Sequence, residues 1–195
     1  MARTIQFANP VRFDTHTRLL SVRGVDVLIH WTVFLIAGLM IYATYRSPWV
    51  TLAGGISWLA LILLHECGHM VAAHRMRSKV LNIELYPIHG LCRFEQPWSR
   101  FNHCVIAWGG VIAQAVVAIP VLLWLEVFGY TRFPAVNAVL GILGPYSLAI
   151  TLFNLIPAGR LDGVMAWKII PEFVHRVKAR KNKKAKAASS GWRTH

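Results

Sequence analysis

Four long apolar runs dominate this sequence and limit the folds that it can adopt. Each has the length of about 20 residues that an α-helix needs to cross the ~30 Å hydrocarbon core of a membrane. The runs cover residues 27–45, 49–73, 101–125 and 133–157. Hydrophobic residues make up 55% of the chain and charged residues 15%, against about 25% charged residues in ordinary soluble domains. The pattern excludes a typical soluble enzyme and predicts an all-α polytopic membrane protein with four transmembrane helices.

The 21 Lys and Arg residues alternate between the two ends of this predicted bundle. Four lie before the first run, five between the second and third, and ten after the fourth, whereas the other two links hold one each. Cytoplasmic loops carry the excess of Lys and Arg in membrane proteins. The alternation therefore predicts both termini in the cytoplasm. The net charge of +13 is then mostly a topology signal, and no nucleic-acid partner is expected.

The runs divide the chain into three segments. Residues 1–26 are predicted to be a cytoplasmic N-terminal segment, residues 27–163 the intramembrane core, and residues 164–195 an amphipathic segment with a basic cytoplasmic tail. The basic run 178–186 is expected to be disordered and to bind anionic lipid of the bilayer. The N-terminal segment lacks the apolar core of a cleavable signal peptide. With no organelle signal visible, we expect a multi-pass protein of a bacterial cell (inner) membrane.

The link between the second and third runs has a pattern of its own. Leu81, Ile83 and Leu85 alternate with polar residues, and Pro87 and Gly90 then turn the chain. Alternation is typical of a strand, and the proline and glycine indicate a turn. We therefore expect a short hairpin or re-entrant loop within residues 81–94. Its open edge could pair with an extended peptide; an ordinary interfacial loop is the alternative.

A polar cluster interrupts the end of the second run. It reads His65-Glu66-Cys67-Gly68-His69, and ionisable residues inside a span are costly and usually mark function. Positions i and i+4 share one face of a helix, so His65 and His69 can bind one metal ion, with Glu66 beside them as a base for water. This HExxH spacing is typical of zinc metallopeptidases. A histidine pair that only packs helices together is the alternative, but it leaves Glu66 without a role.

A catalytic zinc site needs a third protein ligand, and the chain has only eight acidic residues. Among these, Asp162 lies just past the fourth run, at its predicted cytoplasmic end. The second and fourth runs cross in the same direction, so His65 and Asp162 are expected at similar depth. Pro157 breaks the preceding helix. Asn154 is then available to hold a substrate carbonyl or, alternatively, to bond a neighbouring helix.

Two segments together resemble a known family. They are the HExxH segment and Asn154-Leu155-Ile156-Pro157-Ala158-Gly159-Arg160-Leu161-Asp162-Gly163. They resemble the HExxH and NxxPxxxxDG motifs of the site-2 protease family of intramembrane zinc metalloproteases, over residues 25–165. The resemblance implies one zinc ion held by His65, His69 and Asp162, with Glu66 as general base and Asn154 positioning the substrate or stabilising the oxyanion. It also implies an endopeptidase that cleaves membrane proteins in or near their transmembrane segments.

The sequence departs from that family at four positions. The family's third-span GPxxN motif reads Gly110-Val111-Ile112-Ala113-Gln114 here, so Val111 and Gln114 replace its proline and asparagine. His89 stands where a second glycine is common, and Val164 stands where a glycine often follows Asp162-Gly163. The chain length leaves no room for a PDZ or CBS domain. These departures concern substrate preference and regulation, and the substrate, any regulatory protein and the oligomeric state stay open.

Three other functions fit parts of the sequence. A di-metal membrane oxidase shares the HxxxH spacing but needs further paired histidines, and no HxxHH segment is present. A divalent-metal transporter needs more spans and a second set of intramembrane ligands. A non-catalytic metal-binding membrane protein gives Glu66 no role. Metal content separates these functions, since one tightly bound zinc ion favours the protease and two irons favour the oxidase.

Overall fold

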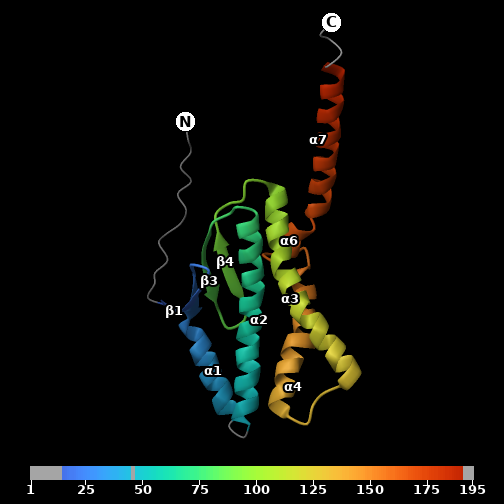
Figure 1. The fold of residues 1–195 in the computed structure, drawn as a ribbon. Helices are drawn as coiled ribbons and strands as arrows, with labels where there is room; N and C mark the ends of the chain where they lie inside the picture. Colours follow the sequence, from blue (N-terminus) through green and yellow to red (C-terminus); the bar gives the residue numbers. More distant parts are fainter. Residues whose placement is uncertain (1–14, 45–46, 191–195) are drawn as a thin grey trace.

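The computed structural model describes residues 15–44 and 47–190 and is mostly helical (Figure 1). Three helical segments are long and apolar enough to cross a membrane: α2 (Pro48–Arg75), α3 (Arg100–Phe128) and the run Pro134–Asn154, which consists of α4 (Pro134–Gly141), η2 (Ile142–Tyr146) and α5 (Ser147–Asn154). They correspond to the second, third and fourth predicted runs. Parts of the predicted terminal segments, residues 1–14 and 191–195, lie outside the described residues.

The first apolar run does not form the transmembrane helix that we predicted. Its first residues, 27–30, belong to strand β2 (Val25–His30), and the helix that follows, α1 (Trp31–Ala43), has 13 residues. At 1.5 Å per residue, α1 is about 20 Å long and shorter than the hydrocarbon core. β2 lies between two other strands and is mostly buried. A strand buried on both faces reads as a continuous apolar run, so the sequence did not distinguish it from a helix, and four spans are not confirmed.

A four-stranded sheet also corrects the all-α prediction. Its order is β1 (His16–Val22), β2, β3 (Val80–Leu85) and β4 (Gly90–Phe94), with β2 and β3 parallel and the other neighbours antiparallel. β3 and β4 form a hairpin within the segment where we expected one. Within the part of the chain that the structure describes, β4 has one strand neighbour and is therefore an edge of the sheet.

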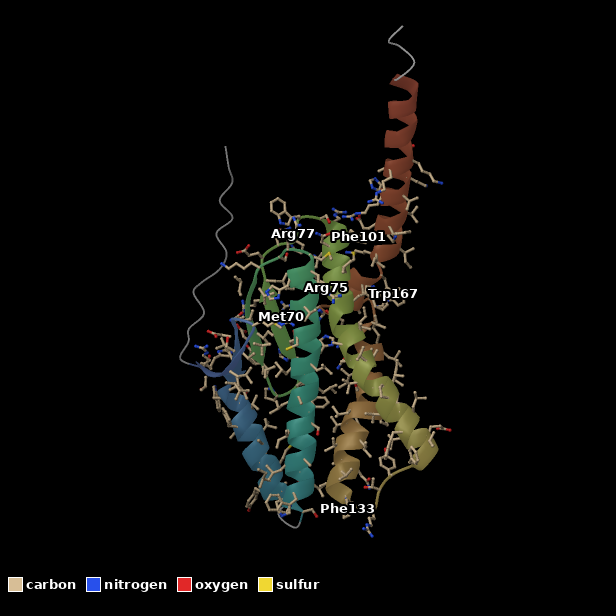
Figure 2. All side chains as sticks on the ribbon, in the orientation of Figure 1. Met70, Arg75, Arg77, Phe101, Phe133 and Trp167 are labelled. Carbon is tan, nitrogen blue, oxygen red and sulfur yellow. The ribbon has the colours of Figure 1, made fainter. Side chains whose placement is uncertain are left out.

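The sheet packs on the side of α2 that faces away from α3 (Figure 1). Figure 2 shows Met70 on the sheet side of α2, where it is buried in one apolar cluster with Val27, Ile29 and Ile83. Strand β3 buries one of its polar residues. Glu84 is fully buried, and the hydrogen bond that its carboxylate accepts from Arg93 Nε at 2.8 Å offsets the cost of burying its charge.

Small residues bring α2 and α3 into close contact. A Cβ atom on Gly109 would lie 2.5 Å from the carbonyl oxygen of Gly68 and 2.8 Å from the Cβ atom of Ala72. A Cβ atom on Gly68 would lie 2.7 Å from the Cβ atom of Ala113. Small residues four positions apart on each helix are typical of close crossings between membrane helices. The crossing lies within the HExxH segment itself, since Gly68 belongs to it.

The third membrane-length run is not a regular α-helix. Its middle, η2, is a π-helical turn that contains Pro145. Proline lacks the N–H group that would continue the α-helical pattern, and its ring crowds the preceding turn. π-helical turns are frequent near functional sites. Beyond this turn, Ser147 and Thr151 of α5 are buried, and Thr151 contacts Gln114 of α3.

The C-terminal segment leaves the bundle as a helix. A short helix, α6 (Gly163–Ala166), is followed by α7 (Ile169–Ser190), which extends beyond the other helices (Figure 1). The basic run 178–186 belongs to α7, so the expectation of disorder is wrong; Lys, Arg and Ala are strong helix formers. The start of α7 is attached to the start of α3, where the Arg176 guanidinium lies 4.0 Å from the centre of the Phe101 ring.

Candidate metal centre

Helix α2 presents the two histidines of the HExxH segment toward α3. Their Nε2 atoms are 3.0 Å apart, as expected for side chains one helical turn apart. The His65 and His69 side chains are 9% and 8% exposed. Polar rings buried to this degree need hydrogen-bond or metal partners. The partners come from α3 and from the segment between α5 and α6.

Asp162 approaches the histidines from the segment after α5. Its Oδ2 atom lies 2.9 Å from His65 Nε2 and 3.3 Å from His69 Nε2. Burial by itself raises the pKa of the Asp162 carboxyl, but hydrogen bonds from His65 and His69 outweigh it and hold that pKa well below its usual range. The side chain is therefore a carboxylate, which is the form that binds a metal ion.

A tight turn places this carboxylate. A Cβ atom on Gly163 would lie 2.6 Å from the carbonyl oxygen of Ile156, so the chain folds back closely on itself here. Trp167 Nε1 donates a hydrogen bond of 2.7 Å to the carbonyl oxygen of Leu155 and closes the segment from the other side. These contacts hold Asp162 opposite α2.

Each imidazole has a second partner on α3. His69 Nδ1 lies 2.8 Å from the carbonyl oxygen of Ile106, and His65 Nδ1 lies 3.0 Å from Gln114 Oε1. A histidine that binds a metal through Nε2 carries its proton on Nδ1 and usually donates it to such an oxygen. Both rings therefore have the acceptor that this tautomer needs. In the sequence, Gln114 stands out only as a departure from the family motif, and no local spacing predicts its contact with α2.

The three side chains fit a single metal ion. Ligand atoms of His65, His69 and Asp162 all lie within 4.8 Å of one another, and ligands of a tetrahedral zinc ion are about 3.4 Å apart. Gly110 of α3 leaves the space beside them open, because a Cβ atom there would lie 2.6 Å from His65 Nε2 and 2.7 Å from His69 Nε2. Two imidazoles and a carboxylate are a ligand set of catalytic zinc sites. This group could bind a metal ion, and zinc itself stays a prediction.

Glu66 lies on the other side of the site, against edge strand β4. A Cβ atom on Gly90 would lie 2.6 Å from Glu66 Oε1, so the backbone of β4 passes close to this carboxylate. Burial, the Glu66 carboxylate and Cys67 raise the pKa of the Cys92 thiol to about 12. Cys92 is therefore a protonated thiol in the metal-free protein.

One cavity of about 940 Å³ connects these groups. Glu66, both histidines and Asp162 line it, and so do Asn154 and the hairpin residue His89. Among the residues that the structure describes, the Asn154 side chain forms no hydrogen bond, so its amide is free to meet a bound molecule. All five predicted site residues thus border one cavity. Their individual roles stay predictions.

Two known proteins resemble this chain, one in sequence and one in fold. No protein-family model matches the sequence. A curated protein of Synechocystis sp. (strain ATCC 27184 / PCC 6803 / Kazusa), named "Putative zinc metalloprotease sll0528", is 29% identical over 189 residues, which cover 87% of this chain. The match covers 47% of that relative, so the chain spans about half of its length.

A solved structure has the same fold. It is the "Site-2 Protease from Methanocaldococcus jannaschii", which superposes with a TM-score of 0.58 at 23% sequence identity. The superposition covers 80% of this chain and 71% of that protein.

Proposed function

The paired motifs, the curated relative and the fold support assigning this chain to the site-2 protease family, and on that premise we propose that it is an intramembrane zinc metalloendopeptidase. The proposed reaction is hydrolysis of a peptide bond in or near a transmembrane segment of another membrane protein. The observation that carries the proposal is that Glu66 shares one cavity with His65, His69 and Asp162. A site that only stored or passed a metal ion would not need a base beside its ligands.

Each of these residues has a role in the proposed reaction. His65, His69 and Asp162 would hold one zinc ion, which when bound supplies Lewis acidity for the scissile carbonyl and a lowered pKa for water. Glu66 accepts a proton from the attacking water and then donates it to the leaving amine. One water molecule is consumed, the carbon–nitrogen bond breaks, and a carboxylate and an amine leave. Asn154 donates a hydrogen bond to the substrate carbonyl oxygen, where negative charge develops.

Edge strand β4 is the proposed docking edge for the substrate. A helical substrate keeps its carbonyl groups in hydrogen bonds, so it must unwind locally before attack. An unwound segment inside a membrane needs new backbone partners, and a free strand edge supplies them. Gly90 and Cys92 of β4 line the cavity beside Glu66. A substrate strand paired there would pass directly in front of the base.

We further propose that the site opens toward the cytoplasm. Figure 2 places Arg77 and Phe101 at one end of the bundle and Phe133 at the opposite end. The Lys and Arg excess lies at the Arg77 end, which is the cytoplasmic end under positive-inside sorting. The termini are then cytoplasmic, and α7 carries exposed Phe173 and Val174 with its basic residues near that surface. This composition fits binding to anionic lipid of a bacterial inner membrane.

The decisive experiment replaces the proposed base. Glu66→Gln is nearly isosteric and leaves the three ligands intact, but the amide cannot accept the proton. Cleavage of a membrane-protein substrate in proteoliposomes is expected to fall at least about 100-fold, with one zinc ion per chain still bound. Glu126→Gln, at an exposed glutamate in α3, is the matched control. Membrane fragments released by cells carrying wild type but not Glu66→Gln would identify the substrate.

Two outcomes contradict the proposal. Retained cleavage in Glu66→Gln removes Glu66 from the mechanism. A wild-type protein that binds one zinc ion per chain and cleaves nothing in these assays is a non-catalytic metal-binding membrane protein.

A further inference from the structure

Gln114 is a deeply buried polar side chain that the proposed reaction leaves without a role. It is 1% exposed within the apolar helix α3. Its Oε1 atom lies 3.0 Å from His65 Nδ1 on α2 and 3.1 Å from Thr151 Oγ1 on α5. A carboxamide buried in an apolar helix is costly unless it is hydrogen-bonded. Both of its contacts reach other helices, so this side chain joins all three membrane-length segments at one point.

The contact belongs to a regular arrangement along α3. Ile106, Gly110 and Gln114 follow one another in steps of four residues and therefore share one face of the helix. The Ile106 carbonyl oxygen meets His69, Gly110 leaves room for both rings, and Gln114 meets His65. His69 meets Ile106, and His65, which precedes it on α2, meets Gln114, which follows Ile106 on α3. This reversed order is expected where two helices run in opposite directions. This face of α3 therefore matches the face of α2 that carries the metal ligands.

We propose that Gln114, restrained by Thr151, is a positioning residue that holds the His65 imidazole with Nε2 directed at the metal ion. The inference rests on the proposed function in one respect, namely that the site binds zinc. The Gln114 carbonyl oxygen accepts the Nδ1 proton of His65, which leaves the Nε2 lone pair for the metal. The Thr151 hydroxyl lies 3.1 Å from the same Gln114 oxygen and 2.7 Å from the Ser147 carbonyl oxygen, so its single proton is shared between these two acceptors. Gln114 does not touch the substrate or the reacting atoms.

The test measures zinc affinity of the purified full chain in detergent, by competition with a chromophoric chelator. Gln114→Leu removes the amide at similar volume and is expected to weaken zinc binding 10- to 100-fold, the usual cost of losing such a partner. Gln114→Glu keeps an acceptor oxygen and is expected to retain nearly wild-type affinity. Thr151→Val acts on the ring only through Gln114, so a loss of about threefold is expected, in line with one hydrogen bond. Ser57→Ala removes a buried hydroxyl that bonds only its own helix and is the control.

The outcomes separate positioning from a merely structural role. Gln114→Leu protein with a lower melting temperature but wild-type zinc affinity overturns the inference, and so does a wild type that binds no zinc. If Gln114→Leu does not fold, Thr151→Val decides, because unchanged zinc affinity in that variant also overturns it. The result is independent of the proposed proteolysis. A Glu66→Gln enzyme that still cleaves would refute the proposed base while zinc loss in Gln114→Leu would stand.

Discussion

The two halves of the candidate metal centre are held in different ways. The histidine half lies on α2, where both rings are less than 10% exposed and each has a partner on α3. The aspartate half lies on an irregular segment between α5 and α6, where the Asp162 side chain is 23% exposed. The helix packing that fixes the first half also holds the protein together. The second half depends on a few local contacts.

This contrast predicts that stability and metal binding can be separated by mutation. Substitutions at the α2–α3 crossing should unfold the protein and abolish metal binding together, because both the fold and the metal site depend on this close packing. Changes in the segment that carries Asp162 should weaken metal binding while the helices stay folded. Changes at β4 should affect only Glu66, the proposed base.

The largest effect is expected from breaking the helix crossing. Gly68→Leu places a side chain where even a Cβ atom would lie 2.7 Å from the Cβ atom of Ala113. Overpacking of this kind costs about 3 kcal/mol or more, so the variant should show a large loss of thermal stability in detergent and bind no zinc. Gly55→Leu in the same helix is the control, since a Cβ atom there meets nothing within 4 Å. Equal stability of the two variants would contradict the claim that the α2–α3 crossing supports both the fold and the metal site.

Asp162→Asn should separate metal binding from folding. The amide keeps the shape of the carboxylate but not its charge, and it is a poor zinc ligand. Zinc affinity is expected to fall by more than about 100-fold, beyond the cost of removing a hydrogen-bonded neighbour of a ligand, with cleavage lost and the melting temperature of the metal-free protein little changed. Elemental analysis and thermal unfolding on the same sample check this. A normal zinc content would exclude Asp162 as a ligand.

Gly90→Ala tests the third region, the edge strand beside the base. The new methyl group would overlap the position of the Glu66 carboxylate and displace it. A displacement of about 1 Å at a catalytic group costs on the order of 100-fold in rate, so kcat should fall while zinc content stays at the wild-type value. Leu91→Ala, next to it on the same strand, is the comparison. Unchanged kcat in Gly90→Ala would show that Glu66 does not act from its observed position.

The smallest effect is expected from loosening the Asp162 segment. Trp167→Phe removes the hydrogen bond to the Leu155 carbonyl oxygen, which is worth about 1 kcal/mol. Zinc affinity should fall about fivefold, the equivalent of that energy. Trp98→Phe, at a side chain that is 88% exposed, is the control. If zinc affinity does not change, the tight turn at Gly163 is sufficient to hold Asp162.

The sequence predicted much of the candidate site because its information is local or topological. The i, i+4 spacing of His65 and His69 is a property of any helix, and the Lys and Arg distribution placed Asp162 at the same end of the bundle. The contact of Gln114 with His65 could not be predicted in this way. This contact depends on the distance between α2 and α3 and on their register, which the close packing of Gly68 against Gly109 sets. Neither quantity can be read from a single segment of the sequence.

The sheet was missed for a different physical reason. β2 is buried between β1 and β3, so Val27, Leu28 and Ile29 lack the polar alternation that distinguishes a half-exposed strand. They are also continuous with the apolar helix α1, and the two together have the length of a span. The hairpin expected within residues 81–94 was predicted correctly because Pro87 marks the turn and Gly90 marks the point where the second strand begins.

The parallel pairing of β2 with β3 bears on biogenesis. Residues 31–79, which include α1 and α2, separate these strands in the chain, and parallel strands require such a crossover connection. β2 therefore cannot pair with β3 until α2 has been inserted into the bilayer and β3, which follows α2, has been synthesised. A newly synthesised chain carries its HExxH helix before the strand that borders Glu66 has been made, so the candidate site is completed late in membrane insertion.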